Sequence, residues 1–328
     1  MATIPRVLPV SIAIVMWCVT AGAETHRFVP TTFYNTFSFA HPPALRIKPG
    51  DTVITVTADA GGVDANDRRV ASGPNPQTGP FYIDGAEPGD MLVVTLNRIE
   101  PNRGTARSAT LLAPYAVDPA FLRSTAERQA RQETWVIDKT KGVARTTSTD
   151  LHPGPLEFPL IPMLGCIGTA PRNREAVSTG TPGSFGGNMD YAGMVAGVKV
   201  MLPVYEPGAL LFIGDGHARQ GHGEVVGTGL ETSMNVEFTV DLVKKKSIGW
   251  PRLETDDSIM VLGSERPLLQ AFQHATTELL QWMTSDYGFD ERTASMLMGQ
   301  AVEYEIANVV DPHFTVVAKL RKAYLRAR

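Results

Sequence analysis

The sequence predicts a mainly β fold: a sandwich-like or barrel-like body of short strands, followed by a C-terminal segment of mixed helices and strands. Gly (30) and Pro (24) are abundant in the 328 residues without a period, which is typical of many turns. Short β-branched runs recur between these turns, and apolar residues change to helical spacing after about Ser264. We therefore expect a β-rich body over residues 24–242 and an α+β segment over residues 243–328 that packs on it.

The strands are predicted from period-two alternation and from short apolar runs. Residues 52–57 and 91–96 each follow a Pro-Gly-Asp turn and are rich in β-branched side chains. Residues 234–242 alternate, so that Val236, Phe238 and Val240 face one way. Residues 209–213 are wholly apolar, which predicts a buried strand. A Gly-rich loop is expected over residues 180–190.

Two helices are predicted in the C-terminal segment. Apolar residues between 268 and 283 fall at helical spacing, and Pro267 suits the first turn of that helix. Gly288 ends it, and Asp290 with Glu291 opens a second helix. A third helix is possible within residues 119–132.

The N-terminus is typical of a secretory signal peptide. Arg6 precedes an apolar run over residues 7–19, and Ala21-Gly22-Ala23 fits a cleavage site. We expect a signal peptide over residues 1–23, cleavage after Ala23 and a periplasmic or secreted protein. The apolar run is short for a membrane span, so we expect no stable insertion, with an uncleaved anchor as the alternative.

Composition and missing motifs exclude several classes of protein. The net charge is −4 and no basic stripe occurs, which argues against a nucleic-acid partner. The motifs GxSxG, GxGxxG, HExxH and CxxC and a phosphate-binding P-loop are absent. After cleavage Cys166 is alone between apolar residues, which indicates an inert buried thiol rather than a nucleophile, although the nucleophile stays open.

The densest polar constellation directly follows the predicted strand that ends at Ile213. Asp215, His217 and His222 are ligands suited to zinc or a similar divalent ion, and glycines between them let the backbone bend so that they converge. Glu224 is predicted to be the general base that polarises a water. The alternative is a solvated turn with surface histidines.

Two further segments could contribute to the same site. Asp190 is a candidate fourth metal ligand, and Asn188 beside it could stabilise an oxyanion. The predicted substrate contacts are Asn75, Thr78, Gly187 and Gly168. The alternatives are an Asx-type turn at residues 186–190 and an ordinary loop at residues 75–80.

An ordered set of motifs resembles the acetamidase/formamidase family. The match runs from about Pro43 to Leu242 and rests on Thr78-Gly79-Pro80-Phe81-Tyr82, Gly85-Ala86-Glu87-Pro88-Gly89-Asp90, Gly187-Asn188-Met189-Asp190, Leu202-Pro203-Val204, Pro207-Gly208-Ala209-Leu210, Gly214-Asp215-Gly216-His217-Ala218, Gly227-Thr228 and Glu231-Thr232. Beyond Leu242 the chain looks like a longer, exported branch with an extra C-terminal segment.

The resemblance implies an amidase that hydrolyses short aliphatic amides, such as formamide or acetamide, to a carboxylate and ammonia. It also implies a β-rich fold, homo-oligomers and a divalent metal at Asp215 and His217. His222 stands where the family usually has Asp, which favours zinc over calcium at this site. The same departure leaves a second hypothesis open: a periplasmic small-molecule binding or interaction protein on an inactive amidase scaffold.

Overall fold

The structure is a computed structural model that describes residues 22–125 and 131–325. The predicted signal peptide, residues 1–23, lies outside the described residues except for its last two. None of the helices in the described part of the chain is long and apolar enough to cross a bilayer.

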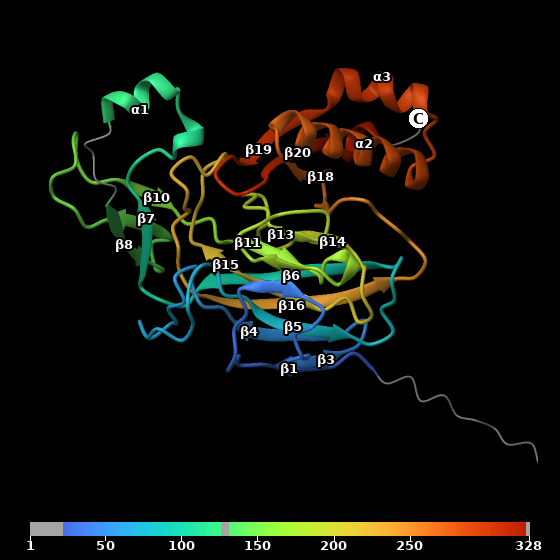
Figure 1. The fold of residues 1–328 in the computed structure, drawn as a ribbon, viewed down its shortest axis with the longest axis horizontal. Helices are drawn as coiled ribbons and strands as arrows, with labels where there is room; N and C mark the ends of the chain where they lie inside the picture. The colour runs from blue at the N-terminus through green and yellow to red at the C-terminus, as the bar shows by residue number, and fades with distance from the viewer. Residues whose placement is uncertain (1–21, 126–130, 326–328) are drawn as a thin grey trace, which may run out of the picture.

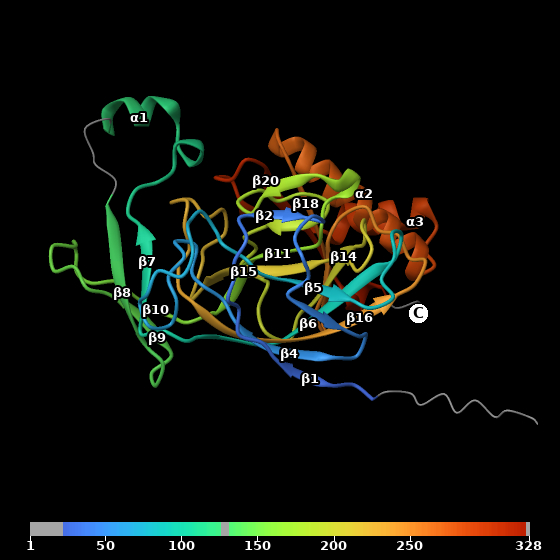
Figure 2. The ribbon, with the colours of Figure 1, turned by 60° about the horizontal axis from the view of Figure 1, so that its bottom comes forward.

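The fold is mainly β, as predicted, and its largest element is a sheet of nine described strands (Figures 1 and 2). In spatial order these strands are β1 (Thr25–Arg27), β4 (Thr52–Val56), β16 (Met234–Val243), β6 (Met91–Pro101), β14 (Lys199–Pro203), β17 (Arg252–Glu254), β18 (Ser258–Glu265), β20 (Phe314–Arg321) and β19 (Glu303–Asn308).

A five-stranded sheet shares one hydrophobic core with this large sheet in the described chain. Its strands are, in spatial order, β13 (Gly186–Asn188), β11 (Met163–Gly168), β15 (Leu211–His217), β5 (Thr78–Ile83) and β3 (Leu45–Ile47). Phe81 of β5 packs edge-on against Phe238 of β16, with 5.2 Å between ring centroids, so the two sheets meet through interdigitated aromatic side chains.

The alternation predicted for β16 is confirmed. Met234, Val236, Phe238 and Val240 are fully buried, while the residues between them are partly exposed. Such one-sided burial is what period-two patterning requires.

A smaller sheet forms an arm at one side of the molecule, together with α1 (Pro119–Thr125) (Figure 2). Its described strands are β10 (Glu157–Pro159), β9 (Val143–Thr146), β8 (Gln132–Asp138) and β7 (Thr105–Ala109). Trp135 and Ile137 of β8 pack with Ala218 and Leu230, so the arm supports the loop that follows β15. The remaining short elements are the pair β2 (Thr36–Ser38) and β12 (Ala176–Ser178), and the 3-10 turns Pro114–Ala116, Arg172–Arg174 and Lys322–Tyr324.

Both helices predicted in the C-terminal segment are present, as α2 (Leu268–Asp286) and α3 (Glu291–Ala301). Asp290 caps α3 by accepting a hydrogen bond from the N–H of Thr293. The helices bury their apolar side chains on β18 and β20 (Figure 1). The segment also does more than pack on the body, because β17 pairs with β14 and the C-terminal strands extend the large sheet.

Parts of two glycine-rich stretches that were expected to be loops belong to strands. β15 continues past Ile213 to His217, and β13 lies within the loop predicted over residues 180–190. A Cβ at Gly214 would meet the side-chain amide of Gln77 at 2.6 Å, and one at Gly216 would meet the Met234 side chain at 2.2 Å. These glycines therefore let neighbouring side chains approach the strand closely.

Candidate active site

Three of the predicted metal ligands lie at the ends of two strands of the five-stranded sheet. β15 carries Asp215 and His217 at its carboxyl end, and Asp190 follows β13. β11 lies between these two strands and pairs with both. The N–H of Asp190 donates to the carbonyl of Gly165 in β11 at 3.1 Å. The sheet thus fixes the three residues side by side.

Gly165 leaves the space that two of the carboxylates occupy. A Cβ at Gly165 would lie 2.3 Å from Asp190 Oδ1 and 2.6 Å from Asp215 Oδ2. Any larger residue would displace both groups, because Cβ atoms do not approach other heavy atoms so closely. Glycine in a buried strand is favoured where another group comes this near to the backbone.

The loop over residues 218–231 brings two more acids to the same place. Glu224 is 6% exposed, and the Gly223 N–H beside it donates to the carbonyl of Ile306 in β19 at 2.8 Å. Glu231 ends the loop, where its N–H donates to the carbonyl of Arg107 at 2.8 Å. Strands from two other parts of the chain therefore anchor this loop.

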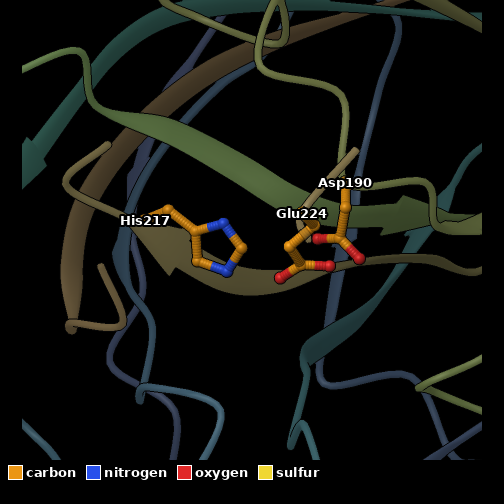
Figure 3. Close-up of side chains that lie close together, drawn as sticks. All are labelled: Asp190, His217 and Glu224. Carbon is orange, nitrogen blue, oxygen red and sulfur yellow. The ribbon is translucent and has the colours of Figure 1, made fainter. Parts of the chain in front are cut away.

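His217 belongs to two groups of acidic side chains. Its Nε2 lies 3.0 Å from Glu231 Oε1 and 3.4 Å from Asp215 Oδ1. One donor atom each of Asp190, His217 and Glu224 also lie within 4.8 Å of one another. Figure 3 shows the carboxylates of Asp190 and Glu224 next to each other, with the imidazole facing them. Together with Asp311, described below, these residues are called the carboxylate cluster: Asp190, Asp215, His217, Glu224, Glu231 and Asp311.

The donor atoms of the cluster fit a divalent metal ion. Asp190 Oδ1, His217 Nε2 and Glu231 Oε2 are buried and lack a hydrogen-bond partner within the described residues; the contact of His217 with Glu231 is not aligned as a hydrogen bond. Buried polar atoms without partners are costly. Carboxylate oxygens and imidazole nitrogen are ligands that zinc and similar ions take. Either Asp190, His217 and Glu224 or Asp215, His217 and Glu231 would hold such an ion.

Burial dominates the protonation of the acids. It raises the pKa of Asp190 well above its usual range, and the neighbouring Glu224 adds to this rise. It raises the pKa of Glu224 in the same way, against the opposing effect of His217. Burial also raises the pKa of Glu231 to about 7, again against His217. These three acids therefore bind protons more tightly than exposed carboxyls do when no cation compensates them.

His217 and Asp215 form the charged pair of the cluster. Burial lowers the pKa of His217, but the carboxylates of Glu231 and Asp215 outweigh it, so this pKa lies well above its usual range. Burial raises the pKa of Asp215, but His217 outweighs it and this pKa is lowered. An imidazolium or a bound cation would thus supply the positive charge that Asp215 needs.

A chain of buried amides leads into the cluster. Gln77 Nε2 donates to Asn75 Oδ1 at 2.8 Å, and Asn75 Nδ2 donates to Asn188 Oδ1 at 2.6 Å. Asn188 Nδ2 then donates to Asp190 Oδ2 at 2.6 Å and to Asp311 Oδ2 at 2.9 Å. Asn188 was predicted to stabilise an oxyanion, but both of its amide hydrogens go to carboxylates here. Its observed contacts orient Asp190 and Asp311.

The C-terminal segment supplies two residues that the sequence analysis missed. Asp311 follows β19, and burial raises its pKa to about 7. Asn308 is fully buried, and its Nδ2 donates to the carbonyl of Met189 at 3.3 Å. No motif marks either residue. Glu231 was also given no role, although it stands in one of the motifs quoted for the family resemblance.

The structure places His222 outside both groups that could hold a metal. Its side chain is 55% exposed, and its Nδ1 lies 3.9 Å from Glu305 Oε2. The hydrogen bond of Gly223 to β19 fixes the turn that directs His222 outward. His222, which was predicted to be a metal ligand, therefore lies outside both groups of donor atoms.

The predicted substrate contacts have mixed outcomes. Asn75 joins the amide chain described above. Thr78 is fully buried, and its hydroxyl donates to the carbonyl of Val56 at 2.9 Å. Gly187 and Gly168 lie in the β13–β11 ladder, where a Cβ at Gly187 would meet the carbonyl oxygen of Thr181 at 2.4 Å. In this structure the two glycines serve close packing.

Cys166 is a buried residue of β11. Burial raises the pKa of its thiol well above the usual range, and its Sγ lies 3.4 Å from the carbonyl oxygen of Thr179. These contacts fit the inert thiol expected from the sequence.

Three of the acids have an uncommon backbone conformation. The φ angles of Asp190, Asp215 and Glu224 are 44°, 55° and 46°, in the left-handed region that favours glycine. Asn75, in the amide chain, has a φ of 48°. Residues held in such conformations tend to cluster at functional sites, where surrounding contacts compensate their cost. The fold and the cluster together define a β-rich protein with a buried carboxylate–imidazole centre that can hold a metal.

Comparison with known proteins shows the family of this chain. The sequence model described as "Acetamidase/Formamidase family" matches residues 29–174 and 171–322. This chain belongs to the acetamidase/formamidase family. The match reaches residue 322, so the segment after Leu242 lies within the family and is not the extra segment that we expected.

Solved structures with similar folds carry the same family name. An acetamidase from Yersinia enterocolitica is 31% identical, with a TM-score of 0.79 over 93% of this chain and 94% of that chain. A predicted acetamidase/formamidase from Thermoanaerobacter tengcongensis is 27% identical, with a TM-score of 0.80 over 93% of this chain and 98% of that chain. An acetamidase from Bacillus halodurans is 29% identical, with a TM-score of 0.76 over 91% and 98%.

A curated relative matches over a shorter region. A Schizosaccharomyces pombe protein named "Putative formamidase" is 28% identical over 197 residues, which cover 45% of this chain and 46% of that protein. The chain thus spans about half the length of this relative.

Proposed function

We propose that this protein is an amidase that hydrolyses short aliphatic amides, of the formamide or acetamide type, to a carboxylate and ammonia. Family membership supports the reaction class. The observation that carries the proposal is the pair of buried, unpaired atoms Asp190 Oδ1 and His217 Nε2 within a cluster of acids. Such atoms are available to a metal ion or a reacting group.

The cofactor in this proposal is a divalent metal, with zinc favoured by the imidazole and calcium as the alternative. When bound, such an ion supplies a Lewis acid that polarises an amide carbonyl and lowers the pKa of a water. His217, with Asp215 and Glu231, would hold it, which leaves Glu224 free to act as a base.

Glu224 is the proposed general base. Amide hydrolysis needs a group that takes a proton from water and gives it to the leaving nitrogen. When a bound cation compensates the acids, Glu224 is available as a carboxylate, and its raised pKa means that it binds a proton more readily than an exposed carboxylate does. Its carboxylate lies beside that of Asp190 and faces His217 (Figure 3).

The predicted signal sequence leads us to propose further that the protein is exported, and we propose that it forms homo-oligomers. Sequencing of protein recovered from the periplasm should give Glu24 as the first residue. An intact N-terminus in that fraction would rule out cleavage.

Ammonia release from formamide, acetamide and propionamide, measured on protein of known metal content, tests the function. We expect turnover by the metal-loaded wild type and a loss of about 100-fold or more in Glu224→Gln, since general bases typically contribute that much. Glu100→Gln, at an exposed position, is the matched control and should keep wild-type activity. Failure of the loaded wild type to release ammonia would favour the small-molecule binding protein instead.

A further inference from the structure

Gln220 connects His217 to two other parts of the chain. Its Oε1 lies 2.8 Å from Nδ1 of His217. Its Nε2 donates to the backbone carbonyls of Asp190 at 2.5 Å and of Ala307 at 3.4 Å. Gln220 is 8% exposed, so all three contacts lie in a buried environment.

These contacts determine which way the Gln220 amide points. The two carbonyls can only accept hydrogen bonds, so they require the NH₂ group on their side. The opposite orientation would place the Gln220 oxygen against two other oxygens. The amide oxygen therefore faces His217, and Nδ1 of His217 must carry a hydrogen to complete the bond.

We infer that Gln220 is a positioning residue that keeps a hydrogen on Nδ1 of His217 and leaves Nε2 as the free ligand atom. Nε2 is the ring nitrogen nearest to Asp215 and Glu231, and it has no aligned partner within the described residues. A partner on one ring nitrogen commonly fixes which nitrogen serves a metal. The inference rests on the proposed function for the metal that Nε2 would bind, but not for the hydrogen on Nδ1.

The surroundings of the ring restrict it further. A Cβ at Gly229 would lie 2.5 Å from both Cγ and Nδ1 of His217, so the backbone of Gly229 packs directly against the imidazole. The N–H of Gly229 also donates to Glu231 Oε1 at 2.9 Å. Gln220 thus acts on a ring that already has little room to move.

Nitrogen-15 NMR of the histidine-labelled protein tests the inference without using activity. In the metal-free wild type, where the imidazolium carries a proton on each ring nitrogen, we expect the Nδ1 proton of His217 to exchange slowly with solvent. Added zinc should shift the Nε2 resonance while the Nδ1 proton remains. A bare Nδ1 in the wild type, or loss of its proton on zinc binding, would overturn the inference whatever the variants do.

Variants then test the role of Gln220 itself. Gln220→Leu removes the acceptor, so the Nδ1 proton should exchange faster with solvent. Zinc affinity should fall by about 10- to 100-fold, the usual cost of losing a partner behind a metal ligand. Gln220→Glu keeps an oxygen facing Nδ1 and, as the carboxylic acid, an O–H facing the two carbonyls, so it should retain the proton signal. If a folded Gln220→Leu protein keeps wild-type zinc affinity, Gln220 has no positioning role.

Ser108 offers a matched control, because it also accepts a hydrogen bond from the N–H of an aromatic ring. Ser108 Oγ accepts a hydrogen bond from Trp135 Nε1 at 2.9 Å, also in a buried environment. Ser108→Ala should leave the His217 spectrum and zinc affinity unchanged, which separates the effect of Gln220 from a general loss of stability. A protein with the Nδ1 proton but without amide turnover would refute the proposed function and support this inference.

Discussion

Asp311 Oδ2 accepts a hydrogen bond from Asn188 Nδ2 at 2.9 Å, although 123 positions separate the two residues in the sequence. Asp311 follows β19 of the large sheet, and Asn188 is the last residue of β13 in the five-stranded sheet, so the bond links two sheets. The C-terminal segment is therefore a component of the carboxylate cluster as well as of the hydrophobic core.

Replacing Asp311 should impair the cluster without unfolding the protein. Asp311→Ala removes one of the two acceptors of Asn188 Nδ2, so Asp190 loses part of its support. We expect kcat/KM for acetamide to fall by about 10- to 100-fold, as for other residues that orient ligands. Asp256→Ala, at an exposed position, should leave it unchanged. Equal rates for the two variants would contradict a role for Asp311.

Gly165→Ala should disturb both aspartates at once. The new Cβ would overlap Asp190 Oδ1 and Asp215 Oδ2, so we expect less bound metal and a loss of about 1–3 kcal/mol in the free energy of unfolding. Gly154→Ala is the control, because nothing lies within 4 Å of its Cβ position. Metal analysis and denaturant unfolding measure the two effects. Full metal occupancy in Gly165→Ala would show that the carboxylates are not held as described.

The metal-free protein should lose stability as the pH rises. The pKa values of Glu231 and Asp311 are raised to about 7, whereas carboxyls in the unfolded chain titrate near 4. Between these values the folded state holds more protons than the unfolded state, so the free energy of unfolding falls with increasing pH. His217 acts in the same direction, since its stabilisation is lost as the pH passes its raised pKa. The lowered pKa of Asp215 acts oppositely, but only below about pH 4.

Melting temperatures of chelator-treated protein measure this dependence. We expect a decrease on the order of 5 °C between about pH 5 and about pH 8, and a flatter profile when a divalent metal compensates the charges. Asp311→Asn should reduce the decrease, whereas Glu100→Gln should not. A melting temperature that rises over this interval in the metal-free protein would contradict the assignment of the raised pKa values.

Metal content should separate His222 from the cluster. His222→Ala should keep wild-type occupancy, because the side chain is 55% exposed and belongs to neither group of donor atoms. Asp215→Ala should lose metal affinity by about 100-fold or more, since it removes a donor and the partner of His217. Mass spectrometry of both purified variants decides the point. Loss of metal in His222→Ala would restore His222 as a ligand.

The strands and helices that could be predicted from the sequence are those with one buried face. Val236, Phe238 and Val240 reveal β16 because every second residue faces the core. The stripe of α2 is visible for the corresponding reason at helical spacing. β13 and the end of β15 were not predicted, since their glycines carry no side chain that could show a period.

The site was predicted where its residues lie close in the sequence or on neighbouring strands. Asp190, Asp215, His217 and Glu224 belong to two groups of donor atoms that share His217. Asp311 could not be predicted, because its partner Asn188 is far away in the sequence and no motif surrounds Asp311. His222 has a suitable side chain at a suitable spacing, but neither property reveals which way a turn directs it.

The hydrogen bonds from Gly223 to the carbonyls of Ile306 and Ala307 also have a consequence for biosynthesis. A ribosome releases the chain from its N-terminus, so Asp215, His217 and Glu224 are made well before the residues that hold their loop. A nascent chain that ends before residue 306 carries these three residues without the anchor that arranges their loop. The complete cluster, and with it the proposed metal site, can therefore form only after β19 has docked, one of the last described strands to be synthesised.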